Sequence, residues 1–410
     1  MYKIPHYNEV FYYKIPRYNE EFYMKLIPRF LAPQVDADTP PLAVAIFGPR
    51  RIGKTTMLEE IVKSRNARWY VGDEPESISA LNFQSLSDVR NALLAYDTIV
   101  IDEAHKLPNI GNTVKMMVDV NEHLDKPARI FITSSSPFYL STVKESALGR
   151  VVSRQMWPLS LQELAASCGW GSIMNNLAHH IVYGLMPNAY STPSDARRFL
   201  SDYCSGLLLR DLLDDTKVRR PDKLRELLVR IALYVGSEVN YDNLARECNI
   251  NRLTVEDYVA KLEQASIIRV CPSYSRNLAN ELKKGKKIYI FDNGIRNALI
   301  QNFAPLAERS DAGALWENFF FMERIKQHDI ERDFSRMFFW RTTGNAPSEI
   351  DFIEELDQKL CAFECKLSDK TKRSRGAALF SKTYPNAPIT VVHPSDCPTV
   401  FALPTSKVKL

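Results

Sequence analysis

Residues 48–55 read Gly-Pro-Arg-Arg-Ile-Gly-Lys-Thr and match the pattern G-x-x-x-x-G-K-[ST] in full. The apolar run at 42–47 predicts a buried strand before this segment, and residues 55–63 predict a helix after it. This order of strand, glycine-rich turn and helix places backbone N–H groups and the positive helix end around phosphate oxygens. The sequence therefore predicts a site for a nucleoside triphosphate.

Two side chains of this loop have specific expected roles. Lys54 would reach the β- and γ-phosphates, and the hydroxyl of Thr55 would bind Mg²⁺. We therefore expect ATP and Mg²⁺ as cofactors. The residues expected at the nucleotide are Gly48, Pro49, Arg50, Arg51, Ile52, Gly53, Lys54, Thr55, Thr56, Thr133 and Ser134.

The acidic half of such a site follows the loop along the chain. Residues 96–103 are an apolar run that ends in Asp102 and Glu103, and residues 68–71 predict another strand before it. Asp102 is expected to hold Mg²⁺ through water, and Glu103 to act as general base toward the attacking water.

Residues after the acidic strand offer further candidates. The strand expected at 129–132 leads into Thr133-Ser134-Ser135-Ser136, whose hydroxyls could contact the γ-phosphate or the attacking water as a sensor. The alternative is an ordinary serine-rich turn. Arg150 could stabilise transition-state charge, including in the site of a neighbouring copy, which would require a homo-oligomer. The alternative is a structural surface arginine.

Residues 102–105 also spell Asp-Glu-Ala-His, the name of a helicase motif. Helicases of that kind need a second motor domain, and nothing after residue 150 repeats the phosphate-loop pattern. We therefore expect His105 to begin a helix.

Length and composition indicate the number of domains and the class of protein in which these motifs occur. A chain of 410 residues predicts about two or three domains. The net charge of +4 is too small to identify a nucleic-acid partner by itself. Seven cysteines without a C-x-x-C pair favour neither zinc nor a disulfide framework. With no signal peptide and no apolar run of membrane length, we expect a cytoplasmic protein without a membrane partner.

The N-terminus contains a tandem copy: YKIPHYNEVFY at 2–12 is followed by YKIPRYNEEFY at 13–23. Two copies are too few for a solenoid. We interpret them as a duplicated leading arm, and a functional aromatic peptide is the alternative.

The middle of the chain has the pattern of a winged helix. Helices are expected at 223–235 and 241–248, and a third begins after Asn251 as its N-cap. Strands at 267–271 and 287–291 follow, joined by a loop with the basic run 283–287. The loop suits DNA phosphates. The third helix, however, exposes Glu256, Asp257 and Glu263, which favours the alternative of a lid or packing module.

The C-terminal part predicts strands at 338–341, 349–355 and 360–367, with a two-residue turn at Asp357-Gln358. In that register Asp351 faces Glu364 and Glu349 faces Lys366. Two acids placed opposite each other repel unless a cation lies between them.

The spacing Asp351, Glu364, Lys366 is the pattern of restriction-endonuclease-like nucleases. Asp351 and Glu364 would bind Mg²⁺, Lys366 would orient the attacking water, and Glu317 on a helix at 315–325 would support the centre. A following helix carries cations suited to a nucleic-acid backbone: Lys370, Lys372, Arg373 and Arg375. The alternatives are a solvated charged hairpin, or a nuclease fold that binds DNA without cutting it.

Several stretches together resemble a widespread prokaryotic group of AAA-type ATPases whose C-terminal domain is of unknown function. They are GPRRIGKTT, IVIDEAHKLP, ITSSSP and ESALGRVVSRQMWPLSLQEL, with further likeness at 274–278, 290–297 and 315–319. The resemblance covers nearly everything from about residue 24 onward. It departs at Ser134, where relatives mostly have glycine, and this departure bears on the sensor. The resemblance implies ATPase activity and a nuclease-like C-terminal fold.

The expected fold class is α/β: a P-loop NTPase parallel sheet of AAA type, an all-α plus winged-helix middle, and a C-terminal α/β restriction-endonuclease-like domain. The expected domains are an arm (1–30), an ATPase core (31–165), a helical lid or linker (166–218), a winged helix (219–292) and a nuclease-like domain (293–410). The expected function is a DNA-associated, Mg²⁺-dependent ATPase with a nuclease-type domain. The alternative is a nucleotide-switched regulatory or scaffold protein whose C-terminal domain binds a partner without cleavage.

Overall fold

A computed structural model describes most of the chain. The described residues are 26–38, 40–135, 149–210, 213, 218–275, 285–342, 348–368 and 374–402, with the backbones of strands β1 (Tyr12–Lys14) and β2 (Tyr23–Lys25). These two short strands pair antiparallel. The rest of the N-terminal duplication lies outside the described residues, as do Lys370, Lys372 and Arg373.

The N-terminal domain is built on a five-stranded parallel sheet with the order β4-β5-β6-β3-β7. Its strands are β3 (Ala43–Phe47), β4 (Ala67–Val71), β5 (Thr98–Asp102), β6 (Arg129–Ser134) and β7 (Val151–Gln155). All five residues of β5 are buried, as expected of a central parallel strand with both faces covered. The four strands predicted at 42–47, 68–71, 96–103 and 129–132 are confirmed.

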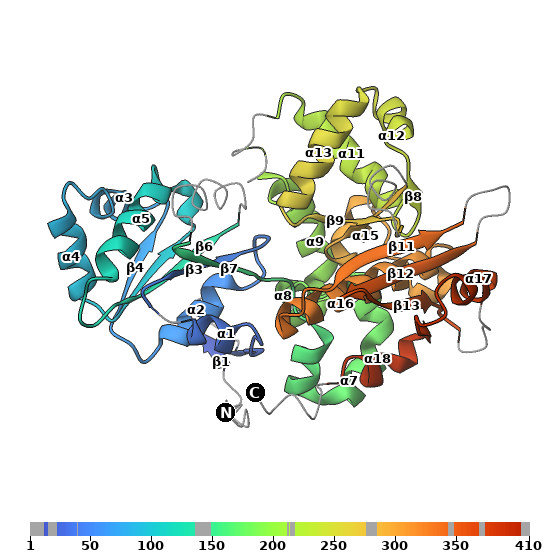
Figure 1. Ribbon diagram of the computed structural model, residues 1–410, viewed down its shortest axis with the longest axis horizontal. Helices are drawn as coiled ribbons and strands as arrows, with labels where there is room; N and C mark the ends of the chain where they lie inside the picture. The colour runs from blue at the N-terminus through green and yellow to red at the C-terminus, as the bar shows by residue number, and fades with distance from the viewer. Residues whose placement is uncertain are drawn as a thin grey trace.

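Helices cover both faces of this sheet (Figure 1). They are α1 (Ala32–Ala37), α2 (Lys54–Val62), α3 (Pro75–Ala80), α4 (Leu86–Leu94), the 3₁₀ turn η1 (Ala104–Lys106) and α5 (Ile110–Asn121). Val44, Ile46 and Phe131 face the α1–α2 side, whereas Ile99 and Ile101 face the side of α4 and α5. The P-loop NTPase fold predicted from the sequence is thus confirmed.

The middle of the chain begins with helices that run from the end of β7. They are α7 (Leu161–Tyr183), α8 (Pro187–Ser191), the 3₁₀ turn η2 (Pro193–Asp195) and α9 (Ala196–Gly206). Ser160 and Glu163 form a capping box at the start of α7. Gly169 has φ +79° and kinks α7, because this backbone conformation interrupts the helix.

Three helices and a small antiparallel sheet follow. The elements are α11 (Pro221–Leu233), β8 (Glu238–Val239), α12 (Tyr241–Cys248), α13 (Arg252–Gln264), β9 (Ile268–Pro272) and β10 (Lys286–Ile290), and the sheet order is β8-β10-β9. The predicted helices and strands are present, and the Asn251 side chain accepts the amide of Thr254 at 2.7 Å as the predicted N-cap.

The C-terminal domain is a four-stranded sheet with a helix on each face. Its elements are α16 (Ala312–Glu331), β11 (Arg336–Arg341), β12 (Glu349–Leu356), β13 (Lys359–Cys365), α17 (Arg375–Thr383), β14 (Ile389–Val392), η4 (Pro394–Asp396) and α18 (Cys397–Val400). The order is β11-β12-β13-β14, with β14 parallel to β13 and the other pairs antiparallel. Phe320 of α16 packs on Phe352 and Phe363, and Phe380 of α17 packs on Trp340 from the other side.

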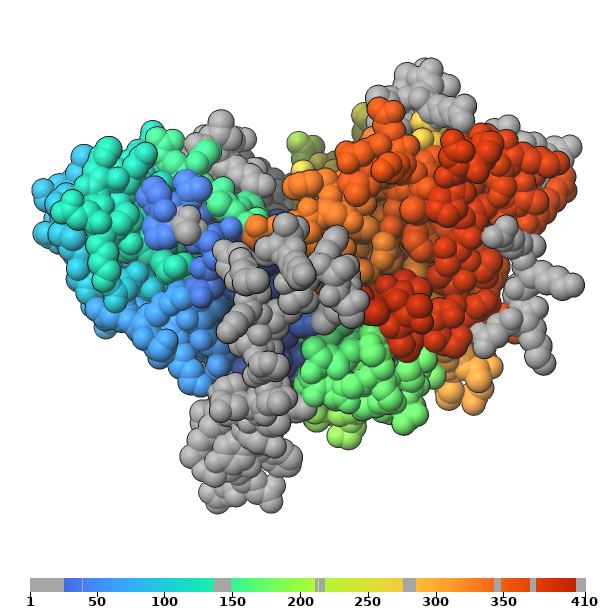
Figure 2. Space-filling view, turned by 60° about the horizontal axis from the view of Figure 1, so that its bottom comes forward, coloured from blue at the N-terminus to red at the C-terminus, as the bar shows by residue number. Residues whose placement is uncertain are grey.

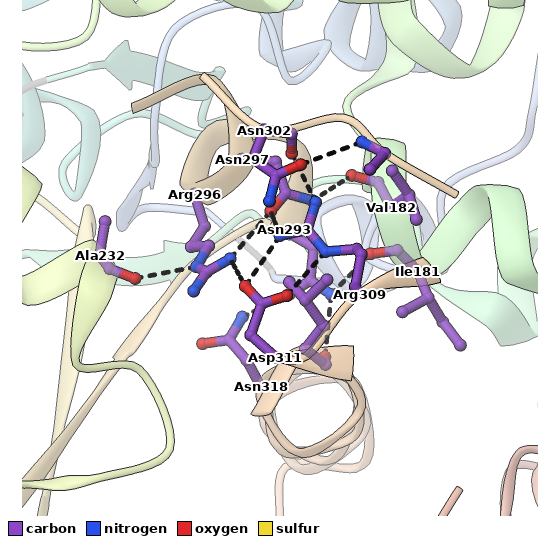
Figure 3. A network of polar contacts seen from close by, with 12 residues as sticks. Ile181, Val182, Ala232, Asn293, Arg296, Asn297, Asn302, Arg309, Asp311 and Asn318 are labelled. Carbon is purple, nitrogen blue, oxygen red and sulfur yellow. Dashed lines mark hydrogen bonds and ion pairs between the residues drawn. The ribbon is translucent and has the colours of Figure 1, made fainter. Parts of the chain in front are cut away.

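A buried polar network joins the middle of the chain to this domain (Figure 3). It centres on α15 (Asn293–Leu299), followed by the turn η3 (Leu306–Glu308). Asn293 donates to the carbonyls of Ile181 and Leu315, at 2.7 and 2.9 Å, and so contacts both α7 and α16. Asp311 accepts from both Arg296 and Arg309, and these bonds outweigh burial and lower the pKa of Asp311 to about 2. The predicted boundary at 292/293 therefore falls in a densely bonded region.

The space-filling view shows two lobes (Figure 2). The blue and teal residues of the parallel-sheet domain form one lobe, and the orange and red residues of the C-terminal domain form the other. The two sheets of the second lobe are directly linked, because Tyr274, just after β9, donates its amide to the carbonyl of Phe339 in β11 at 2.6 Å. In the parts of the chain that the structure describes, no helix has both the length and the apolar character needed to cross a membrane.

Candidate functional site

The phosphate loop connects β3 to α2. Gly48 has φ +152°, and a Cβ there would lie 2.2 Å from the carbonyl oxygen of Met156, so only glycine fits against the chain that leaves β7. Gly53 has φ +95° and precedes the first residue of α2. Lys54 is buried, and its Nζ donates to the carbonyls of Gly48 and Pro49 at 2.8 and 2.9 Å. The loop therefore curls around the lysine ammonium group, as a phosphate cradle requires.

The acidic strand end lies against the start of α2. Thr55 Oγ1 donates to Asp102 Oδ2 at 2.9 Å, and Thr133 Oγ1 donates to Asp102 Oδ1. Two predicted Mg²⁺ residues are thus in direct contact: Thr55 in the first turn of α2 and Asp102 at the end of β5. The donor set of a hydroxyl and a carboxylate beside a buried lysine fits Mg²⁺ bound to a nucleotide.

Glu103 lies directly after β5 in a left-handed conformation, with φ +51°. This conformation is uncommon for a residue with a side chain and recurs at functional sites. The Glu103 carboxylate lies 3.7 Å from Arg50 Nη2, 3.4 Å from His105 Nε2 and 3.4 Å from Ser135 Oγ. The candidate base therefore contacts the phosphate loop and the end of β6.

The predicted sensor residues have different positions. Thr133 contacts Asp102 and also accepts the backbone amide of Glu103 at 3.1 Å, so it connects the two acids. Ser134 ends β6 and pairs with Phe47 of β3. The hydroxyl that reaches Glu103 belongs to Ser135, a member of the run 133–136 considered for the sensor. His105 was expected to begin a helix but is the second residue of the turn η1, which begins at Ala104, and its contact with Glu103 was missed.

Two residues far from the motifs support the phosphate loop. The hydroxyl of Tyr203, on α9, donates to the carbonyl of Arg50 at 3.2 Å. Arg29 donates to the carbonyls of Ile52 and Trp157 at 2.7 and 2.6 Å and pairs with Glu163 at 3.0 Å. Neither residue stands in a recognisable pattern, so only the folded chain shows these contacts. The loop is therefore held by the helical middle of the chain as well as by its own sheet.

Arg150 lies just before β7, where it pairs with Asp119 of α5. Because β7 runs parallel to β3, its start lies at the opposite end of the sheet from the phosphate loop. Five residues of strand separate the two ends, roughly 16 Å. Arg150 is thus remote from the phosphate loop of its own chain.

The C-terminal hairpin has the predicted register. Phe352 pairs with Phe363 and Leu356 with Lys359, and Asp357 and Gln358 both have positive φ, as a tight hairpin turn requires. Asp351 accepts the amide of Cys365 at 2.7 Å and lies 3.9 Å from Lys366 Nζ. Glu364 accepts the hydroxyl and the amide of Ser374, the N-cap of α17.

Glu317 and Glu349 have a partner that the sequence did not suggest. Lys287 of β10 pairs with Glu317 at 2.9 Å and also with Glu349, which was expected opposite Lys366. Tyr289 donates to the same Glu317 oxygen at 2.6 Å. Burial raises the pKa of Glu317 to about 7, against the lowering effect of Lys287. Burial would lower the pKa of Lys287, but Glu317 and Glu349 raise it above its ordinary value.

Three family models match successive parts of the chain. Residues 41–165 match the model described as AAA domain, residues 174–306 match Domain of unknown function (DUF8612), and residues 312–403 match Domain of unknown function (DUF4143). With the geometry of the phosphate loop, the first match defines the class: the chain carries an AAA-type ATPase domain. The AAA-type assignment made from the sequence is confirmed.

Similar proteins are known from sequence and structure. Uncharacterized proteins of Mycobacterium bovis and Mycobacterium tuberculosis are each 26% identical over 380 residues, 89% of this chain and 80% of theirs. A Walker-type ATPase of Pyrococcus abyssi has a TM-score of 0.47 at 13% identity, covering 66% of this chain and 94% of its own. The Aeropyrum pernix Orc1 protein in complex with DNA has a TM-score of 0.30 at 13% identity, covering 67% and 90%. At such low sequence identities and TM-scores, these structural similarities do not indicate an activity for this chain.

Proposed function

We propose that the chain is a Mg²⁺-dependent ATP hydrolase in which Glu103 is the general base. The observation that supports this most strongly is the contact of Thr55 with Asp102 beside the buried ammonium of Lys54. Thr55 and Asp102 would hold Mg²⁺, which supplies charge neutralisation at the phosphates. Lys54 and the loop amides would bind the phosphates, and Glu103 would take a proton from the attacking water.

Two substitutions separate binding from hydrolysis. Lys54→Ala should abolish or severely weaken ATP binding, because it removes the buried ammonium group. Glu103→Gln should leave binding intact while turnover falls by roughly 10²-fold or more, the usual scale for a lost general base. Calorimetric titration of ATP and a phosphate-release assay measure the two effects. Normal turnover in Glu103→Gln would remove Glu103 from this role.

We further propose that the middle of the chain is a winged helix that associates with DNA. The order α11-β8-α12-α13-β9-β10 supports the fold, because it is helix–turn–helix followed by an antiparallel hairpin. The cations of α13 do little to favour DNA binding, because they already pair with acids of the chain. Arg252 pairs with Asp242 and Glu256, and Lys261 pairs with Asp257. Lys286 lies over the Tyr241 ring and Lys287 is buried. The candidates left in the basic run are Lys283 and Lys284, which lie outside the described residues.

For the C-terminal domain we propose a restriction-endonuclease-like fold with Asp351, Glu364 and Lys366 as a candidate nuclease centre. The hairpin register and the 3.9 Å contact between Asp351 and Lys366 support this assignment. Mn²⁺-dependent nicking of supercoiled DNA that Asp351→Asn abolishes would establish the activity. A chain that nicks no DNA form in any variant would contradict it.

The second candidate function is a nucleotide-switched protein whose C-terminal domain binds a partner without cutting. A specific observation favours it: the carboxylates of Asp351, Glu364 and Glu317 each accept hydrogen bonds from groups of the chain itself. ATP turnover indifferent to DNA, together with an absence of nicking, would distinguish it from the first.

A further inference from the structure

Lys287 is the most deeply buried lysine among the described residues, with 0% of its side chain exposed. It belongs to β10 of the small middle sheet, yet its ammonium group lies among acids of the C-terminal domain. Glu317 comes from α16 and Glu349 from β12. A lysine without compensating charge would not remain buried in this way, so the acids and the lysine must be considered as one unit.

The charges of this unit extend to Asp351. Burial is the largest effect on both groups, lowering the pKa of Lys287 and raising that of Glu317. Their ion pair opposes burial in each case, and the carboxylate of Asp351 raises the pKa of both. Asp351 has a second cation in Lys366, 3.9 Å away. Two lysines therefore lie beside acids of the candidate nuclease centre: Lys287 pairs with Glu317, and Lys366 lies beside Asp351.

The donor set does not fit that cation. Mg²⁺ needs a near-octahedral shell of oxygen atoms that face the ion. Here Oε1 of Glu317 accepts from both Lys287 and Tyr289, Oδ2 of Asp351 accepts from an amide, and both oxygens of Glu364 accept from Ser374. Within the described parts of the chain, no group of three His, Cys, Asp or Glu side chains is arranged to hold a metal ion.

We propose that Lys287 is an internal counter-ion that takes the place of the divalent cation in the candidate nuclease centre. While β10 holds it there, the centre binds no metal ion, and the domain does not cut DNA. The assignment of the centre rests on the nuclease-type function proposed above, whereas the exclusion of metal by Lys287 does not.

The position of Lys287 is secured by the way the two sheets join. Asn318 of α16 bonds to both the amide and the carbonyl of Ile290, at 2.8 and 2.9 Å, and so fastens β10 to α16. The amide of Tyr274, after β9, bonds to Phe339 of β11. Withdrawal of Lys287 from the acids thus requires the middle sheet to separate from the C-terminal domain.

The test is calorimetric titration of Mn²⁺ into full-length protein that carries Asp102→Asn, which removes the acid expected to bind metal in the ATPase site. With Lys287 native, no Mn²⁺ should bind. Adding Lys287→Met removes the charge at nearly constant length and should raise Mn²⁺ affinity by about 10²-fold or more, because an ammonium no longer repels the ion. A further Glu317→Gln should abolish the new binding, and Lys287→Arg, the matched control, should remain metal-free.

Other outcomes overturn the proposal. Mn²⁺ binding by the protein with native Lys287 that Glu317→Gln or Asp351→Asn removes would contradict it. A folded Lys287→Met variant that binds no Mn²⁺ would contradict it as well. If Lys287→Met fails to fold by circular dichroism, Lys287→Met/Glu317→Gln decides: recovery of the fold supports the counter-ion role, since no unpaired charge is then buried, and failure to recover opposes it.

A nicking assay on supercoiled DNA with the same proteins separates the two proposals. Mn²⁺ bound by Lys287→Met without nicking would end the nuclease proposal and leave the counter-ion role intact. Mn²⁺-dependent nicking by the protein with native Lys287 would contradict the counter-ion proposal and support the nuclease proposal.

Discussion

At the scale of single residues, the role of Arg150 in ATP hydrolysis depends on whether it acts in the site of a neighbouring copy. Its pairing with Asp119 lies at the end of the sheet away from the phosphate loop, so any part in hydrolysis must be played in another copy. An arginine supplied in trans stabilises transition-state charge and contributes on the order of 10³-fold or more to turnover. The alternative is that Arg150 only fastens β7 to α5.

We expect Arg150→Ala to slow ATP hydrolysis by roughly 10²- to 10³-fold without weakening ATP binding. Asp119→Asn is the matched control, since it breaks the same ion pair and leaves Arg150 in place. Mixing Arg150→Ala with Lys54→Ala should restore part of the turnover, because the second chain contributes its Arg150 to sites of the first. Equal losses in Arg150→Ala and Asp119→Asn, or a chain that stays monomeric with ATP in light scattering, would show a structural role alone.

At the scale of elements, α7 carries His180, whose pKa is set by burial more than by its place in the last turn of the helix. A cation is ordinarily favoured in the last turn of a helix, where His180 lies. Burial, with a smaller effect of His179, nevertheless lowers the pKa of His180 to about 4. His180 lies against Tyr190 of α8, with ring centroids 5.6 Å apart, so protonation would place a charge between two packed helices.

The stability of this helical region should therefore depend on pH. Because the folded pKa lies below the unfolded value of about 6.5, the unfolded chain binds the proton more strongly. Stability from the neutral ring is present above about pH 6.5 and is lost as pH falls toward 4, by on the order of 3 kcal/mol. Urea unfolding at several pH values should show this slope in the native chain and in His123→Gln, an exposed-site control, but not in His180→Leu. An unchanged slope in His180→Leu would assign the effect to other groups.

At the scale of the whole molecule, the phosphate loop and the C-terminal domain belong to one connected structure. Tyr203 of α9 contacts Arg50 in the loop, α9 packs against α15, and Asn293 of α15 bonds to both α7 and α16. A ligand can shift such a structure only by the difference in its affinity for two states. DNA bound at the middle of the chain would alter ATP turnover by this route.

We expect duplex DNA to change ATP turnover several-fold at about 50 mM salt, and the effect to vanish by about 200 mM, because phosphate contacts release counterions. Lys283→Ala/Lys284→Ala should remove the effect, whereas Lys261→Ala should not, since Asp257 already neutralises that cation. Turnover measured across a salt series provides the test. Indifference to DNA at every salt concentration would favour the nucleotide-switched alternative.

Local sequence patterns were sufficient to predict several strands, the phosphate loop and one hairpin of this molecule. The apolar runs that became β3, β5 and β6 are continuous because central parallel strands are buried on both faces, and the phosphate loop follows from glycines with positive φ. The hairpin register around Asp357-Gln358 was also predictable, since a two-residue turn sets the pairing of its strands. β7 was not predicted, because its residues are all half-buried and leave no continuous apolar run.

The sequence by itself thus determined many of the strands, the phosphate loop and the register of the C-terminal hairpin, all of which depend on neighbours within a few residues. Only the tertiary structure decided which groups those residues meet. Ser135 reaches Glu103, Tyr203 reaches the phosphate loop, and Lys287 reaches Glu317 across 30 residues of chain. No periodicity records such contacts, because they arise when separate elements pack around a shared core and buried charges must find partners there.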